Sequence, residues 1–143
     1  MLPLQHVNYW RLAGFILLSL VMLSALMPAT WFWNDKVKVL SLFEHSDKLL
    51  HATTFLVLVI WFSGQYRRPA YWGIAAALML FGGLIEICQL MVSNRSASWG
   101  DIGANTVGIL VGLTVAMSGL GGWSLRVEDW YLARTTGTNG PTR

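Results

Sequence analysis

Charged side chains are scarce in this sequence, and cysteine is nearly absent. Asp, Glu, Lys and Arg make up 12% of the 143 residues, whereas an ordinary soluble domain carries about 25%. The net charge of +3 comes from so few basic residues that a nucleic-acid-binding surface, which needs a dense basic face, is excluded. The single cysteine, Cys88, excludes an internal disulfide and any CxxC redox or zinc motif. We therefore expect one small, membrane-embedded protein.

The sequence instead contains long runs of apolar residues. The composition is 55% hydrophobic with a mean hydropathy of +0.51, and a membrane-spanning helix needs about 20 mostly apolar residues. Four segments predict an all-α, integral membrane four-helix bundle: residues 9–27, 49–64, 70–92 and 102–120. The second segment is short and contains His51, so it needs tilt or shielding by its neighbours.

The start of the chain has two interpretations. Arg11 before an apolar run, with Ala25 and Ala29 near a cleavage position, is compatible with a cleaved signal peptide. The aromatic residues 31–33, which follow Pro28, are typical of a membrane interface and favour a retained anchor.

The distribution of basic residues predicts the orientation. With four spans, the amino terminus, the turn at residues 65–69 and the carboxyl tail lie on one side, which carries more arginine than the other. That side has Arg11, Arg67, Arg68, Arg126, Arg134 and Arg143, and the opposite side has Lys36, Lys38, Lys48 and Arg95. Because basic residues accumulate in cytoplasmic segments, we expect a multi-pass protein of the bacterial cytoplasmic (inner) membrane with both termini in the cytoplasm.

Seven polar side chains lie in or beside the apolar segments, all toward the predicted outer side. They are Asp47, His51, Glu86, Gln89, Arg95, Asp101 and Asn105. The pairs within each helix are three or four residues apart and so share a helix face, which lets three helices direct polar groups into one pocket. An ionisable group at membrane depth costs roughly 2.5 to 3.5 kcal/mol, so such groups are usually paired, line a cavity or are functional.

The residue types suggest roles for this cluster. His51 would be the general base, because imidazole exchanges protons near neutral pH, with Asp47 or Asp101 orienting it and Glu86 as the acid. Arg95 would bind phosphate or carboxylate through its planar guanidinium. The other candidate ligand-binding residues are Gln89, Asn105, Lys48 and Ser98. A metal held by His51, Asp47, Glu86 and Asp101 is a weaker hypothesis, since one histidine with carboxylates gives little specificity. No cofactor is expected.

Each residue of the cluster also has a purely structural interpretation. Asp47 and Asp101 stand where a helix N-cap is wanted, and His51 could be a hydrogen-bonded structural residue. Glu86 could pair with Arg95 or Lys48. The amides of Gln89 and Asn105 could bond between helices.

Three further patterns are visible. A small residue recurs at every fourth position of the last span, at Ala104, Gly108, Gly112 and Ala116, which favours close packing against a neighbour in this chain or in another subunit. Residues 29–46 suit an interfacial outer segment able to cover the site. Residues 123–134 suit a cytoplasmic interfacial helix, and 135–143 suit a disordered end.

Several polar and small residues follow one another at spacings that resemble the VanZ-like family. They are Asp47, Lys48, His51, Phe55, Leu58, Glu86, Gln89, Arg95, Ser98, Asp101, Ala104, Asn105, Gly108 and Gly112. The resemblance covers about residues 47–112, and it departs from the family at residues 91–94, which lack the usual Pro or Gly, and at Ala97. It implies a multi-pass bacterial membrane domain over residues 1–122, followed by a cytoplasmic tail over 123–143. The family is named for an accessory protein of teicoplanin resistance.

Three hypotheses about function follow. The first is an outward-facing polar pocket that binds or modifies an amphiphilic envelope molecule and so affects glycopeptide resistance. The second is a noncatalytic assembly or accessory protein whose polar cluster is structural. The third is an oligomeric transporter. The expected partners are the bilayer, the envelope amphiphile and either a second copy of the chain or an envelope protein.

Overall fold

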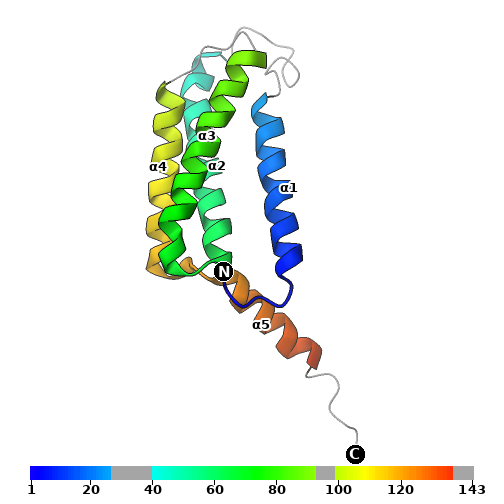
Figure 1. Ribbon diagram of the computed structural model, residues 1–143. Coiled ribbons are helices and arrows are strands. Elements are labelled where there is room, and N and C mark those ends of the chain that lie inside the picture. The colour runs from blue at the N-terminus through cyan, green and yellow to red at the C-terminus, as the bar shows by residue number, and fades with distance from the viewer. Residues whose placement is uncertain (27–39, 93–98, 137–143) are drawn as a thin grey trace, which may run out of the picture.

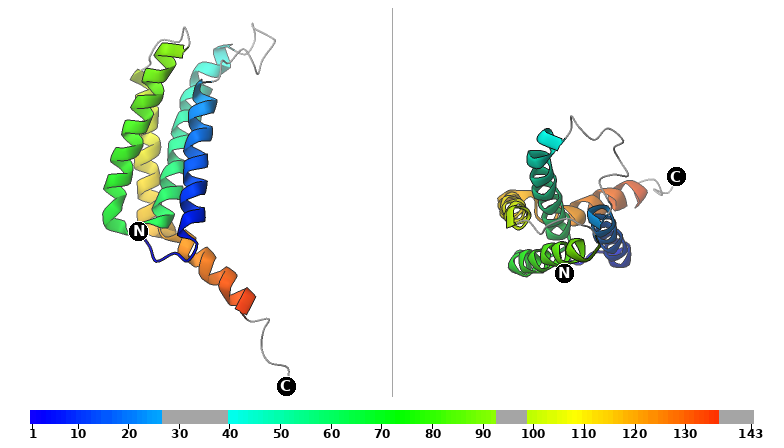
Figure 2. Two further views of the ribbon diagram at one scale, coloured as in Figure 1. Left: turned by 45° about the vertical axis from the view of Figure 1, so that its right-hand side comes forward. Right: turned by 90° about the horizontal axis from the view of Figure 1, so that it is seen from above.

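The computed structural model describes residues 1–26, 40–92 and 99–136, except for the side chains of residues 40–47, 92, 135 and 136, and every regular element in that part is helical. Four long helices run side by side, and a fifth leaves one end of the bundle at an oblique angle (Figures 1 and 2). The bounds are α1 Val7–Leu26, α2 Leu40–Gln65, α3 Tyr71–Val92, α4 Trp99–Val115 and α5 Trp123–Thr136. The predicted all-α class is confirmed.

In the part of the chain that the structure describes, three of the long helices are apolar enough to cross a membrane. They are α1 over Val7–Leu26, α3 with the short turn before it over Arg68–Met91, and α4 with its helical extension over Trp99–Leu120. Only 6% of the apolar window of α1 and 33% of the windows of the other two are buried inside the protein, so most of these apolar side chains face outward, as lipid-exposed helices require. Helix α2 is less apolar, because Lys48, His51 and two threonines lie within its first fifteen residues. The expected class therefore holds, but three of the described helices, not four, are long and apolar enough to span, and the exception is the second, which was predicted to be the weakest.

Helix α2 begins earlier than the sequence suggested. Its first residue is Leu40, nine residues before the predicted start of the second span at residue 49. Residues 40–46 of the expected interfacial segment are therefore the start of α2, and residues 29–39 lie outside the described residues. The tail expected to be disordered, residues 135–143, was predicted to begin too early, because α5 continues to Thr136. Residues 137–143 lie outside the described residues.

The alternative interpretation of Asp47 and Asp101 as N-caps is wrong. Asp47 lies inside α2, and Asp101 is the third residue of α4, within its first turn. An N-cap must have a non-helical backbone just before the first turn, and in each case helical residues precede the aspartate. Asp101 still benefits from its position, because a carboxylate in the first turn interacts favourably with the helix dipole.

The small residues of α4 form the contact with α2. A methyl group added at Gly108 would clash with the backbone carbonyl oxygen of Ala52, and one added at Gly112 would lie 2.8 Å from Cβ of Val59. The two backbones can approach this closely only because these positions carry no side chain. The stripe is thus a packing surface, and its neighbour is α2 of the same chain.

The arginine-rich end of the bundle gathers segments distant in sequence. The amino terminus, the turn before α3 and the start of α5 all lie there (Figure 1), and the backbone N–H of Leu2 donates to the carbonyl of Gln65 at 2.9 Å. Gly119, with a φ of 137°, breaks the helical backbone inside the stretch Ala116–Leu120 that extends α4. The Arg126 guanidinium then donates to the carbonyl of Gly119 at 3.0 Å. These bonds turn the chain out of the bundle into α5.

Candidate functional site

The contact between α2 and α4 brings together two of the predicted site residues. Nδ1 of His51 lies 3.1 Å from Oδ1 of Asn105, across a sequence separation of 54 residues. Since the amide oxygen can only accept, the imidazole Nδ1 is the donor in this bond. His51 lies eleven residues after the start of α2, and Asn105 lies six after the start of α4, so the pair lies toward the end of the bundle opposite the arginine-rich end.

Helix α3 packs against Asn105 and Phe55 at Gly82. A methyl group at Gly82 would lie 3.0 Å from Nδ2 of Asn105 and 3.0 Å from Cζ of Phe55. Glu86 is one helical turn further along α3 and therefore lies on the same side of that helix. Asn105 thus packs between the helix that carries His51 and the helix that carries Glu86.

Four polar side chains of α3 and α4 are buried at this end of the bundle. Glu86, Gln89, Asp101 and Asn105 are each exposed by only 3% to 6%. The side-chain amide of Gln89 donates to the carbonyl oxygen of Ala25 at 2.8 Å, which satisfies one of the carbonyls left without a partner at the end of α1. Burying four such groups is costly unless they are bonded or lie next to water.

A cavity of about 130 Å³ opens beside this cluster, between α1, α2 and α3. His51, Thr54 and Phe55 of α2 line it, together with Ser24 of α1 and Gln89 of α3. Two predicted site residues therefore share one cavity. Glu86, Asp101 and Asn105 do not line this cavity, although they are buried in the helices around it.

The remaining predicted residues are placed only in part. Lys48 is exposed on α2. The side chain of Asp47 and all of Arg95 and Ser98 lie outside what the structure describes. Among the described side chains, no group of three or more His, Cys, Asp or Glu is arranged to hold a metal ion.

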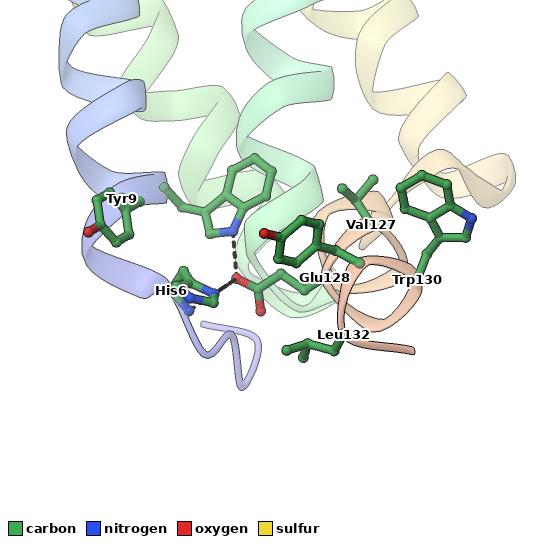
Figure 3. Close-up of a pocket in the computed structure, with 8 residues that line it drawn as sticks. His6, Tyr9, Val127, Glu128, Trp130 and Leu132 are labelled. Carbon is green, nitrogen blue, oxygen red and sulfur yellow. Dashed lines mark hydrogen bonds and ion pairs between the residues drawn. The ribbon is translucent and has the colours of Figure 1, made fainter. Parts of the chain in front are cut away.

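A second site, which the sequence analysis missed, lies at the arginine-rich end. The Glu128 carboxylate on α5 accepts hydrogen bonds from the backbone N–H groups of Gln5 at 2.8 Å and His6 at 3.1 Å, and from the indole N–H of Trp10 at 2.8 Å. Nδ1 of His6 lies 3.6 Å from the same carboxylate. Figure 3 shows His6 and Glu128 directed toward each other. The donors lie more than 100 residues from Glu128 in the sequence, so they leave no local signal around it.

These contacts keep Glu128 ionised. Burial by itself would raise the pKa of this carboxyl group, but the hydrogen bonds from Trp10, Gln5 and His6, together with the nearby His6 side chain, bring the pKa below its ordinary value of 4.5. The ionised Glu128 carboxylate therefore holds residues 5, 6 and 10 of the amino-terminal segment against α5.

An open pocket of about 400 Å³ lies between the start of α1 and α5 (Figure 3). Its lining includes the rings of Tyr9, Trp10, Trp130 and Tyr131, together with Glu128. Behind Trp10, the indoles of Trp61 and Trp123 complete a cluster of three rings whose centroids are 5.4 to 5.7 Å apart. This packing holds α5 against the bundle.

The fold and these two sites define a small multi-pass helical membrane protein with polar groups buried at one end and an aromatic pocket at the other. A family model described as VanZ/LLP1 matches residues 5–120. The chain therefore belongs to the VanZ/LLP1 family, as the spacing of its polar residues suggested. Comparison with curated proteins and with solved structures gave no match.

Proposed function

We propose that this VanZ-family protein binds the head group of an anionic amphiphile of the bacterial envelope in the cavity beside His51. The observation that carries the proposal is the His51–Asn105 hydrogen bond at the edge of a cavity that His51 and Gln89 line together. Because many of the side chains on the outer surface of the bundle are apolar, this cavity is where a polar ligand group would be solvated by protein.

The dimensions of the cavity favour an amphiphile. A volume of about 130 Å³ compares with about 30 Å³ per water molecule, so it suits a small head group and is too small for a whole lipid molecule. Leu50 lines the cavity and is itself largely exposed on the outer surface of the bundle. An amphiphile could therefore place its head in the cavity and leave its chains in lipid.

The surrounding residues suggest how the head group would be held. Arg95, just before α4, would pair with phosphate or carboxylate, aided by the amino-terminal end of that helix. Because Nδ1 of His51 donates to Asn105, Nε2 would be the nitrogen that accepts a proton if the bound molecule is also modified. From the positive-inside rule we infer that this end of the bundle faces outward from the inner membrane.

Substitutions separate this function from the structural alternative. We expect His51→Ala, Glu86→Gln and Arg95→Ala to leave the protein abundant in membranes but to remove its envelope phenotype, measured as teicoplanin sensitivity. Removing one hydrogen bond to the charged head group should weaken binding of the amphiphile about tenfold. Arg67→Ala and Asp129→Asn are matched controls, because both side chains are exposed away from the site.

The alternatives give different results. Loss of the protein itself in all three variants would assign the cluster to helix assembly, as in a noncatalytic accessory protein. Unchanged abundance with an unchanged phenotype would contradict any role for the cavity.

A further inference from the structure

The cavity beside His51 is lined by polar side chains, and among the described residues of its lining there is no Lys, Arg, Asp or Glu. Ser24 and Thr54 contribute hydroxyl groups, and Gln89 contributes an amide. An ionic group taken into this cavity would lose its water without gaining an opposite charge, which is costly. The part of a ligand that enters the cavity is therefore polar and uncharged.

Two of the lining groups already use their hydrogen within the protein. Nδ1 of His51 donates to Oδ1 of Asn105 at 3.1 Å. The Ser24 hydroxyl donates to the carbonyl oxygen of Val21 at 2.9 Å. What each group still offers is an acceptor, namely Nε2 of the neutral imidazole and the lone pairs of the serine oxygen. A ligand group that donates hydrogen bonds satisfies both.

The third lining group, the Thr54 hydroxyl, makes no hydrogen bond within the part of the chain that the structure describes. A threonine in a helix often donates to a carbonyl of the preceding turn, as the Thr106 hydroxyl does to Ile102 at 2.8 Å. The Thr54 hydroxyl can therefore both donate to a ligand and accept from it. A ligand hydroxyl has the same two capacities, whereas an ammonium group only donates and brings a charge into the cavity.

We propose that the head group of the envelope amphiphile is a small polyol, whose hydroxyls bond to Ser24, His51 and Thr54 while its anionic group stays at the mouth of the cavity. This inference rests on the proposed function and names the chemistry of the head group. Lys48 is exposed and lies three residues before His51 on the same side of α2, where it is placed to pair with the anion. A volume of about 130 Å³ holds about four water molecules, so the cavity admits a glycerol group but not a large saccharide.

Binding is measured by native mass spectrometry on the full chain in detergent at about pH 8, where imidazole is ordinarily neutral. The main probes are phosphatidylglycerol and phosphatidylmethanol with the same short acyl chains, because they carry the same charge and differ in the head-group hydroxyls. Two hydrogen bonds to those hydroxyls should make phosphatidylglycerol bind about tenfold more tightly. Phosphatidylethanolamine, whose head group ends in an ammonium, should also bind more weakly than phosphatidylglycerol.

Thr54→Val keeps the branched shape of the side chain and removes its hydroxyl. We expect this variant to bind phosphatidylglycerol about fivefold more weakly and phosphatidylmethanol as the wild type does. Ser24→Ala, on a different and more exposed helix, should have the same selective effect. Thr53→Val is the matched control, because Thr53 is the exposed neighbour of Thr54 and does not line the cavity. It should bind both lipids like the wild type, and thermal unfolding in detergent shows whether each variant is folded.

The outcomes separate this inference from the proposed function. Clear and equal binding of phosphatidylglycerol and phosphatidylmethanol would overturn the polyol and leave the proposed function standing, whereas binding of neither lipid would overturn both. Full phosphatidylglycerol binding by both Thr54→Val and Ser24→Ala would also contradict the inference. So would equal binding of phosphatidylethanolamine, or displacement of phosphatidylglycerol by free glycerol phosphate at the same concentration, which would assign the cavity to a soluble polyol phosphate.

Discussion

Replacing Gly108 by leucine is expected to separate α4 from α2 and to cost about 3 kcal/mol or more of stability. Even a methyl group at Gly108 would clash with the carbonyl oxygen of Ala52. The obstacle is backbone, which cannot rotate away as a side chain can, so the helices must move apart. The His51–Asn105 bond joins the same two helices and would be lost with them. Thermal unfolding in detergent, followed by size-exclusion chromatography, measures the effect.

Gly103→Leu is the matched control. Gly103 lies on the same helix, but nothing is within 4 Å of a methyl group added there. Leucine also has a higher helix propensity than glycine, so this variant should be as stable as the wild type or slightly more stable. If the two leucine variants unfolded at the same temperature, the close approach of α2 and α4 would be wrong.

Replacing Phe55 by alanine is expected to cost about 3 to 5 kcal/mol, the usual range for a fully buried phenylalanine. Phe55 is 1% exposed, its ring centroid lies 6.5 Å from that of Phe81, and the ring forms part of the wall of the cavity beside His51. Its removal would join the cavity to the space left in the core. The same unfolding assay tests the loss of stability.

Phe15→Ala is the control for Phe55→Ala, because it removes the same group from an exposed position on α1. A side chain that faces lipid in the folded protein gains little from folding, so the change should be within about 0.5 kcal/mol. Equal destabilisation by the two alanine variants would contradict the assignment of Phe55 to the core.

Much of the fold could be predicted because membrane helices leave a strong signal. The runs of apolar residues locate α1, α3 and α4 within a few residues of their observed ends. The spacing of four between Asp101 and Asn105 predicted a shared helix face, and both side chains are buried. The meeting of His51 with Asn105 followed from the expectation that polar groups in lipid find one another.

Other features could not be predicted, for identifiable reasons. The start of α2 at Leu40 was missed because hydropathy marks the part of a helix that lies in lipid, and Glu44 and Lys48 fall outside that part. The anchoring of Glu128 by Gln5, His6 and Trp10 was missed because it joins the two ends of the chain. No local pattern records such a contact.

Cysteine labelling in intact cells tests the outward-facing polar cavity most directly. In a Cys88→Ser background, Thr54→Cys places a thiol in the cavity, and Val57→Cys places one on the exposed apolar surface of the same helix. A membrane-impermeant maleimide reacts with thiolates, which form in water but not in lipid. The account predicts labelling of Thr54→Cys and not of Val57→Cys. Labelling of Thr54→Cys only after the cells are permeabilised, or equal labelling at both positions, would contradict it.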